Sequence, residues 1–231
     1  MTKFISIVSG KGGTGKTVTA INLAVALKSL GRDVILFDAN LSSPNIALYL
    51  GMKTPSTLND VLSGKRHIRE AIYLHPSSLK IVPADIYALG QNYPKKLSSV
   101  LLDLIGKAEI VIIDSASGLG RETLSAISSS DESIIVANPT AASITDSYKM
   151  VKAVESLGST AAGIVLNRVT KSQSAVFPEA IQNYTQSHVI AAIPEDRNIE
   201  KSISISHPIV CSHPRSPASV EFRKAAELLN I

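Results

Sequence analysis

Eight consecutive residues near the amino terminus have the types and spacing that bind phosphate. They follow a short β-branched run and are, in order, Gly10, Lys11, Gly12, Gly13, Thr14, Gly15, Lys16 and Thr17. The glycines allow the backbone to curl so that its N–H groups point at phosphate oxygens, and a helix beginning near Lys16 adds the positive end of its dipole. We expect Lys16 to contact the terminal phosphates of a nucleotide and the Thr17 hydroxyl to bind Mg²⁺. Position 18 is the apolar Val18, to which we assign no role in nucleotide binding.

A carboxylate that suits the same chemistry stands at the end of a later apolar run. Ile110, Val111, Ile112 and Ile113 lead into Asp114. An acidic residue at the end of a buried strand can hold a Mg²⁺-bound water beside a phosphate loop, so Asp114 is a candidate metal residue. The alternative is a strand-terminal aspartate that only caps the next turn.

Short β-branched runs alternate with helix-like segments along the whole chain, as the positioning of such a site requires. Strands are predicted near residues 3 to 9, 33 to 38, 79 to 83, 109 to 114, 132 to 137, 160 to 166 and 188 to 193. Helices are predicted at 16 to 30, 57 to 63, 94 to 107, 121 to 130, 143 to 157, 175 to 186 and 216 to 229. The serine- and proline-rich stretch from 202 to 219 is expected to be irregular. This alternation predicts an α/β fold with a mainly parallel sheet and helices on both faces.

The composition supports one large α/β domain over residues 1–231. Apolar residues make up 45% and aromatic residues only 4%, so the core must consist mostly of aliphatic side chains. The formal net charge is +4, with no block of like charge, and nucleic acid is therefore not indicated as a partner. The single cysteine, Cys211, excludes a disulfide scaffold or a Cys-cluster metal site within one chain, and we expect an intracellular protein.

The loop from residue 10 to residue 17 also has a more specific signature. Lysine directly after the first glycine, in the run K-G-G-T-G-K-T, resembles the deviant Walker A loop of the MinD/ParA family of P-loop ATPases. The resemblance is nearest to archaeal-type MinD and implies a three-layer P-loop NTPase fold, ATP or ADP with Mg²⁺, and a homodimer formed on ATP. In that dimer Lys11 would reach the partner's nucleotide. The alternative for Lys11 is a solvent-facing loop charge.

The second predicted strand ends where the family carries its first switch. The resemblance places Asp38 near Mg²⁺ and the phosphates, and Asn45 matches a switch asparagine of the MinD branch. Asn40 replaces the family's second aspartate. An amide can orient the attacking water but cannot accept a proton as a carboxylate can, which predicts slow hydrolysis. A simple turn asparagine is an equally weighted alternative for Asn40.

Later segments continue the resemblance in family order. Residues 115 to 119 resemble the second switch, with Ala116 where the family has proline. Gly163 to Arg168 resembles a strand end at which the asparagine, here Asn167, reads adenine, and an amide suits that task because it pairs a donor with an acceptor. The adenine-side residues implied by the resemblance are Asn167, Arg168, Pro194, Glu195 and Asp196.

The family resemblance implies a switch that dimerises on ATP and controls spatial positioning or cell division by recruiting a protein partner. The predicted last helix mixes both charge signs with apolar residues and is expected to pack on the core, without a basic membrane tail. The expected location is cytoplasmic, with at most an indirect, peripheral membrane contact. Alternatives are a slow or non-hydrolysing nucleotide-binding scaffold, a small-molecule kinase or ligase, and a metal-cluster carrier, which the single cysteine disfavours.

Overall fold

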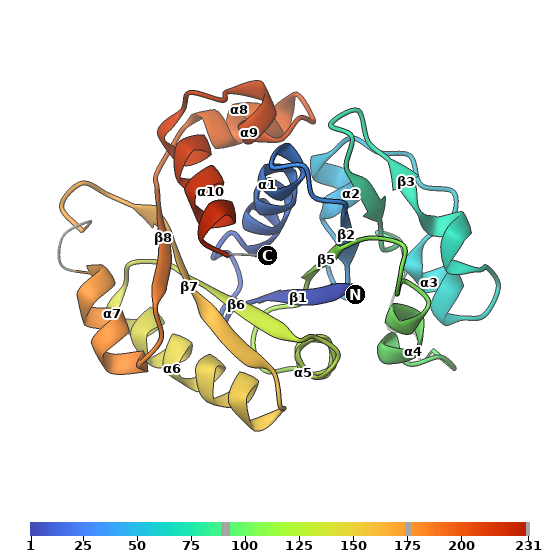
Figure 1. Cartoon of the computed structure of the whole chain (residues 1–231), viewed down its shortest axis with the longest axis horizontal. Helices are drawn as coiled ribbons and strands as arrows, with labels where there is room; N and C mark the ends of the chain where they lie inside the picture. The colour runs from blue at the N-terminus through green and yellow to red at the C-terminus, as the bar shows by residue number, and fades with distance from the viewer. Residues whose placement is uncertain (89–92, 174–176, 230–231) are drawn as a thin grey trace.

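The computed structural model describes residues 1–88, 93–173 and 177–229 and contains one eight-stranded sheet (Figure 1). The strands are β1 (Lys3–Val8), β2 (Val34–Asp38), β3 (Tyr73–Leu74), β4 (Lys80–Val82), β5 (Ile110–Asp114), β6 (Glu132–Ala137), β7 (Thr160–Val169) and β8 (Val189–Pro194). Their order across the sheet is β3-β4-β2-β5-β1-β6-β7-β8. The pairing is parallel throughout except between β3 and β4.

Helices cover both faces of this sheet, which gives the predicted three layers. They are α1 (Lys16–Ser29), α2 (Ile46–Tyr49), α3 (Leu58–Leu62), η1 (Ile68–Ala71), α4 (Leu97–Leu102), α5 (Arg121–Ser128), α6 (Ala141–Ser156), α7 (Phe177–Thr185), α8 (Asn198–Ser204), α9 (Ile209–Ser212) and α10 (Pro217–Leu228). In Figure 1 α1 and α10 lie on one side of the strands, and α5, α6 and α7 lie on the other. The α/β prediction is therefore confirmed.

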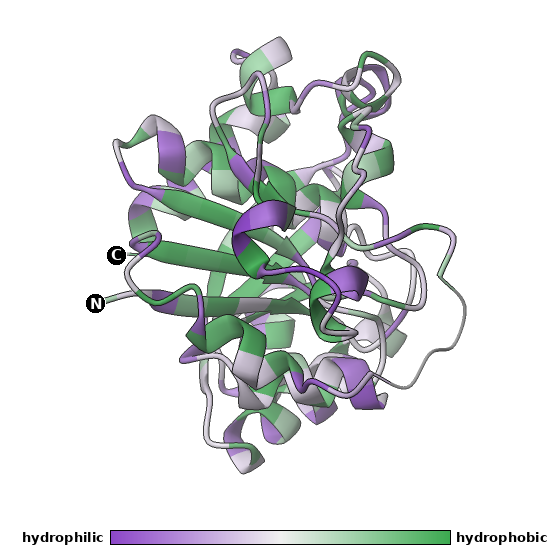
Figure 2. Ribbon diagram, turned by 90° about the vertical axis from the view of Figure 1, so that its right-hand side faces the viewer, coloured by the Kyte–Doolittle hydropathy of each residue, from purple (hydrophilic) through white to green (hydrophobic). Residues whose placement is uncertain are grey.

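Alternate residues of the buried strands form the two halves of the core. Ile5 and Leu36 pack with α1 and α10, whereas Phe4, Ile35 and Phe37 pack on the opposite face with α3, α4 and α5. This follows from the period of two in a strand, and both kinds of position are apolar because both faces are covered. Figure 2 shows the central strands as continuous hydrophobic ribbons.

The predicted strands are found within a few residues of their expected bounds, but several other predictions need correction. The helix expected over 94–107 is only Leu97–Leu102, and the strand expected over 160–166 continues to Val169. Gly106 has a φ of 76°, in the left-handed region, and lies in the turns that follow α4. The short elements α2, η1 and β3 are too brief to produce a periodic pattern.

The stretch from 202 to 219 is not irregular, contrary to the prediction. It contains the end of α8, all of α9 and the start of α10. Ser219 is fully buried and donates its hydroxyl hydrogen to the carbonyl oxygen of Ile209 at 2.9 Å. Serine hydroxyl groups in this segment form hydrogen bonds with backbone groups of tight helical turns. A segment with a polar composition can therefore be helical and packed.

The last helix packs on the core, as predicted. Ala218, Phe222, Ala225 and Ala226 are buried against α1 and β8, whereas Leu228 is exposed. Within the described residues, no helix is long and apolar enough to cross a membrane.

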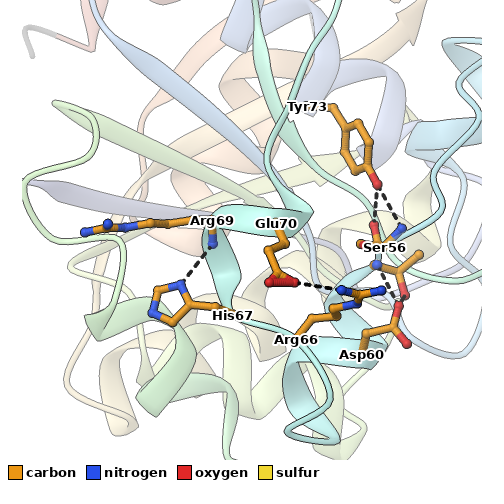
Figure 3. Close-up of polar contacts among 8 residues, drawn as sticks. Ser56, Asp60, Arg66, His67, Arg69, Glu70 and Tyr73 are labelled. Carbon is orange, nitrogen blue, oxygen red and sulfur yellow. Dashed lines mark hydrogen bonds and ion pairs between the residues drawn. The ribbon is translucent and has the colours of Figure 1, made fainter.

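The segment that contains α3 and η1 packs on the same face of the sheet as α4 and α5, and Figure 3 shows polar contacts within it. Thr57 and Asp60 form a reciprocal capping box at the start of α3. The Tyr73 hydroxyl accepts a hydrogen bond from the Ser56 N–H at 2.8 Å and donates to the Ser56 carbonyl oxygen at 3.0 Å. These local bonds fix the chain between α2 and the edge hairpin formed by β3 and β4.

Candidate nucleotide-binding site

The phosphate-binding loop connects β1 to α1 and is shaped by its glycines. Gly13 and Gly15 have φ values of 74° and 92°, a conformation that other residues adopt at a cost. A Cβ atom on Gly15 would lie 2.0 Å from Nδ2 of Asn167. Glycine at position 15 therefore permits both the turn into α1 and the close approach of the asparagine.

Lys16 and Thr17 begin α1 at the base of a cavity of about 380 Å³. Lys16 is buried, and its burial lowers the pKa of the ammonium group, an effect opposed by the nearby charge of Asp114. The Thr17 hydroxyl donates a hydrogen bond to Oδ2 of Asp114 at 2.6 Å. The first turn of the helix thus holds a cation and a hydroxyl beside a carboxylate.

Val18 follows these two residues in the same helical turn and also lies in the wall of the cavity. Its half-buried side chain packs against the hydrophobic core between α1 and the sheet. An isopropyl group has no atom that could bind a phosphate or a metal ion. The contribution of Val18 to the site is therefore apolar contact alone.

Asp38 and Asp114 stand side by side because β2 and β5 are paired in register at these two residues. Both side chains are fully buried. Burial, and then the charge of Asp114, raises the pKa of Asp38 well above its usual range. Burial raises the pKa of Asp114 to about 6, while the Thr17 hydrogen bond and the charge of Lys16 act in the opposite direction.

The oxygen atoms gathered here suit a hard divalent cation. Thr17, Asp38 and Asp114 supply one hydroxyl and two carboxylates, which are preferred donors for Mg²⁺. Within the described part of the chain, Oδ1 of Asp114 is buried without a hydrogen-bond partner. A buried, unpartnered carboxylate oxygen is costly by itself, and a bound cation would satisfy it. The residues present therefore fit the ion.

Residues 40 to 45 form the loop between β2 and α2, here named the first loop. Asp38 anchors both of its ends, because its two oxygens accept hydrogen bonds from the N–H groups of Asn40 and Ile46, each at 3.2 Å. The side chain of Asn40 turns back onto Ser43, donating to its carbonyl oxygen at 2.6 Å and accepting from its N–H at 3.2 Å. Asn45 also donates to the Ser43 carbonyl, at 2.8 Å. The amide of Asn40 is thus engaged within its own loop.

Residues 115 to 120 form the loop between β5 and α5, here named the second loop. Its start is tied to β1, because the Ser115 hydroxyl donates to the carbonyl oxygen of Ile7 at 2.8 Å. The N–H of Gly118 donates to the carbonyl oxygen of Ser9 at 2.9 Å, next to the phosphate-binding loop. Ser117 lies in the cavity wall, and its Oγ is 3.6 Å from the position that a Cβ on Gly12 would occupy.

Lys11 points along the surface of its own chain. Its Nζ forms an ion pair with Oδ2 of Asp146 in α6 at 2.9 Å, and its side chain is 54% exposed. The loop comes close to α6 at this point, since a Cβ on Gly10 would lie 2.6 Å from the Cβ of Asp146. Lys11 is therefore neither a freely solvated loop charge nor a ligand of the cavity within one chain.

Asn167 is a buried residue near the end of β7 and contacts the phosphate-binding loop. Its Nδ2 donates to the carbonyl oxygen of Thr14 at 2.8 Å, and its Oδ1 is buried without a hydrogen-bond partner among the described residues. Asn138 braces it by donating to the carbonyl oxygen of Asn167 at 3.1 Å. Arg168 follows with a φ of 60° and an exposed side chain. A free buried acceptor beside the loop suits an amino group of a ligand.

The turn after β8 lies next to this strand end, since Val169 is paired with Pro194. The N–H of Glu195 donates to the carbonyl oxygen of Val169 at 3.1 Å. Asp196 accepts hydrogen bonds from the N–H groups of Asn198 and Ala218, at 2.9 Å and 3.3 Å. The carboxylate of Asp196 therefore fastens α8 to α10.

The cavity brings together some of the sequence-predicted residues and leaves others outside. Its walls include Gly12, Gly13, Gly15, Lys16, Thr17, Asn40, Asn45 and residues of the second loop. Lys11, Asp38, Asp114, Asn167, Arg168 and residues 194 to 196 are not part of its lining. Sequence reasoning did not assign roles to Ser42, Glu122 or Asp146. No local pattern marks Ser42 and Glu122, because they are 80 positions apart and meet only in the folded chain.

Comparisons with known proteins agree with this geometry. The family model described as the CobQ/CobB/MinD/ParA nucleotide binding domain matches residues 5–209. An uncharacterized ATP-binding protein of Methanocaldococcus jannaschii is 40% identical over 97% of this chain and 86% of its own length. The septum site-determining protein MinD of Pyrococcus horikoshii, complexed with Mg-ADP, is 37% identical, with a TM-score of 0.91 over 98% of this chain and 95% of that one.

A second similar structure is the MinC:MinD cell division protein complex of Aquifex aeolicus. It is 28% identical, with a TM-score of 0.88, and the match covers 99% of this chain and 96% of that one. The fold and site define a P-loop nucleotide-binding protein. The chain belongs to the CobQ/CobB/MinD/ParA family, in its MinD/ParA group of ATPases.

Proposed function

We propose that this protein, as a single domain over residues 1–231, is a MinD-like ATPase that binds ATP with Mg²⁺ and changes its association state with the bound nucleotide. The observation that carries the proposal is that Lys16 and Thr17 line one cavity while the Thr17 hydroxyl donates to the buried carboxylate of Asp114 directly behind them. A buried ammonium group beside a hydroxyl–carboxylate pair suits the phosphates and the metal of a nucleoside triphosphate.

The roles within the site follow from its chemistry. The backbone of Gly10 to Thr17 would bind the phosphates, and Lys16 would neutralise their terminal charge. Thr17, Asp38 and Asp114 would hold Mg²⁺, which supplies charge stabilisation to the transferred phosphoryl group. Asn40 and Asn45 belong to the loop that would face the attacking water.

The adenine side would be formed by the adjacent ends of β7 and β8. The free Oδ1 of Asn167 can accept a hydrogen bond from the amino group of adenine. Arg168, Pro194, Glu195 and Asp196 would flank the base, the last through the turn that its carboxylate holds together.

The cellular role that we propose is the control of spatial positioning or cell division through a protein partner. It is supported by the similarity to MinD in the MinC:MinD complex. Any membrane contact would then be peripheral and indirect, through that partner.

Direct measurement of nucleotide binding and turnover tests this function. We expect the purified chain to bind ATP and ADP in the presence of Mg²⁺ and to release phosphate from ATP, and we expect Lys16→Ala to lose both activities. Lys152→Ala is a matched control, since Lys152 is an exposed lysine paired with Glu155 on α6. An intact chain that binds neither nucleotide would overturn the proposal.

A second candidate is a slow or non-hydrolysing scaffold that captures a partner in its nucleotide-bound form. The contacts of Asn40 favour it, because both hydrogen bonds of its amide are made to Ser43. We expect Asn40→Asp to raise turnover by about tenfold or more, since a carboxylate can accept the proton of the attacking water. Equal turnover in the wild type and the variant would contradict the assignment of slow hydrolysis to Asn40.

A further inference from the structure

The first turn of α5 contacts both loops that line the cavity. The carboxylate of Glu122 accepts hydrogen bonds from the N–H of Ser42, at 3.2 Å, and from the Ser42 hydroxyl. The neighbouring Thr123 is fully buried and donates its hydroxyl hydrogen to the carbonyl oxygen of Ala116 at 3.0 Å. Two consecutive side chains of one helix therefore hold the first loop and the second loop.

Glu122 holds the first loop near its middle, whereas Asp38 holds the ends. Ser42 is exposed, and its contact with Glu122 spans the space between the loop and the helix. Asn40 and Asn45 both bind Ser43, so residues 40 to 45 are braced internally. A loop that is braced internally moves as a unit. The hydrogen bonds between Ser42 and Glu122, here called the tie, fix the position of that unit relative to α5.

The hydrogen bonds from Ser42 to Glu122 suit a carboxylate. Glu122 lies in the first turn of α5, where the helix dipole stabilises negative charge. Two donors from one residue converge on its two oxygens, and hydrogen bonds to a charged acceptor are stronger than neutral ones. Glutamine would keep one acceptor oxygen and lose the charge, while alanine would remove the tie.

We propose that Glu122 is a positioning residue that couples the two loops, so that a shift of either loop on nucleotide binding displaces the other through α5. Glu122 is not among the residues that line the cavity, and it acts through Ser42. This inference rests on the proposed ATPase function. It predicts an effect on turnover and not on ground-state nucleotide binding, because the phosphate-binding loop and Lys16 do not depend on the tie.

Steady-state kinetics of four variants and one control variant test the coupling. We expect Glu122→Ala and Ser42→Ala each to lower kcat by about five- to tenfold, with KM for ATP and the affinity for ADP changed by less than about twofold. Glu122→Gln should lose less than Glu122→Ala. The double variant should be no worse than either single variant, because both remove one interaction. Glu200→Ala, at an exposed carboxylate in the first turn of α8, is the matched control and should match the wild type.

Hydrogen exchange of the nucleotide-free chain tests the same coupling without turnover. Glu122→Ala should speed exchange in peptides covering residues 40 to 45 and also in those covering 115 to 120. Faster exchange in the first loop alone, or additive losses of kcat, would overturn the proposal. A wild type without turnover would count against the ATPase function only, since the exchange measurement still decides whether Glu122 joins the loops.

Discussion

At the scale of single residues, the site is dominated by two buried carboxylates that lie beside each other at the ends of paired strands. Asp38 and Asp114 both have raised pKa values, chiefly because of burial. A cation at this position would reverse the penalty of ionising both side chains. Proton binding and metal binding should therefore compete at this pair.

This competition predicts a pH dependence with a defined sign. The pKa of Asp114 is about 6 in the folded state against an ordinary 3.8, so the folded state binds the proton more readily. Without metal, the free energy of unfolding should fall as the pH rises from about 4 to about 6, by about 3 kcal/mol for this one group. Urea unfolding across this range measures the effect.

Magnesium should act in the opposite direction, because it binds the ionised form. We expect Mg-ADP to stabilise the wild type more at about pH 7.5 than at about pH 5, and Asp114→Asn to lose most of this difference. Equal stabilisation at both pH values would show that Asp114 does not exchange a proton for the metal.

At the scale of elements, strand β7 holds its place through a glycine that has no room for a side chain. Gly163 has a φ of 147°, and a Cβ there would lie 2.6 Å from Cγ2 of Ile190 and 3.0 Å from the carbonyl oxygen of His188. The pairing of β6 with β7 shifts its register nearby, between Ser133 and Ile134. This strand carries Asn167 to the phosphate-binding loop, so its position matters to the site.

Two alanine substitutions separate steric crowding from backbone strain. Gly158 also has a positive φ, of 79°, but nothing lies within 4 Å of a Cβ placed there. We expect Gly158→Ala to cost about 1 kcal/mol of unfolding free energy and Gly163→Ala about 3 kcal/mol or more. Denaturant unfolding of both variants measures the two losses of unfolding free energy. Equal losses would mean that β8 shifts to accommodate the new methyl group at position 163 without an energetic cost.

At the scale of the whole molecule, the role that we propose for Lys11 requires a second copy of the chain. In the monomer it is paired with Asp146, and this pair is partly exposed, so its contribution to stability is small. A partner's phosphates carry more charge than one carboxylate and could draw the lysine away from Asp146.

Size-exclusion chromatography in the presence of ATP and of ADP measures whether the chain dimerises and whether Lys11 is required. We expect a dimer with ATP and a monomer with ADP for the wild type, and a monomer in both for Lys11→Ala. Lys152→Ala is the control, because Lys152 has the same exposure of 54% and the same kind of carboxylate partner. A mass that does not respond to the nucleotide, or an unaffected Lys11→Ala variant, would contradict the assigned role.

The whole molecule also shows why its architecture could be predicted more fully than its loops. Long β-branched runs and the loop from Gly10 to Thr17 are local patterns, and their order implied parallel strands with ligands at one edge. The brief elements α8 and α9 were missed because a serine-rich composition favours turns. Packing overrides that preference, since α9 packs on α1 and α10 and α8 packs on α9.

The sequence by itself determined the phosphate-binding loop, the carboxylates that end two strands and the three-layer order of elements, because each is encoded by neighbouring residues. Only the tertiary structure decided how Asn40 is used, that Lys11 pairs with Asp146, and that Glu122 reaches Ser42. These contacts join atoms from separate loops and helices. Their geometry depends on how the packed sheet places those loops, which no local spacing encodes.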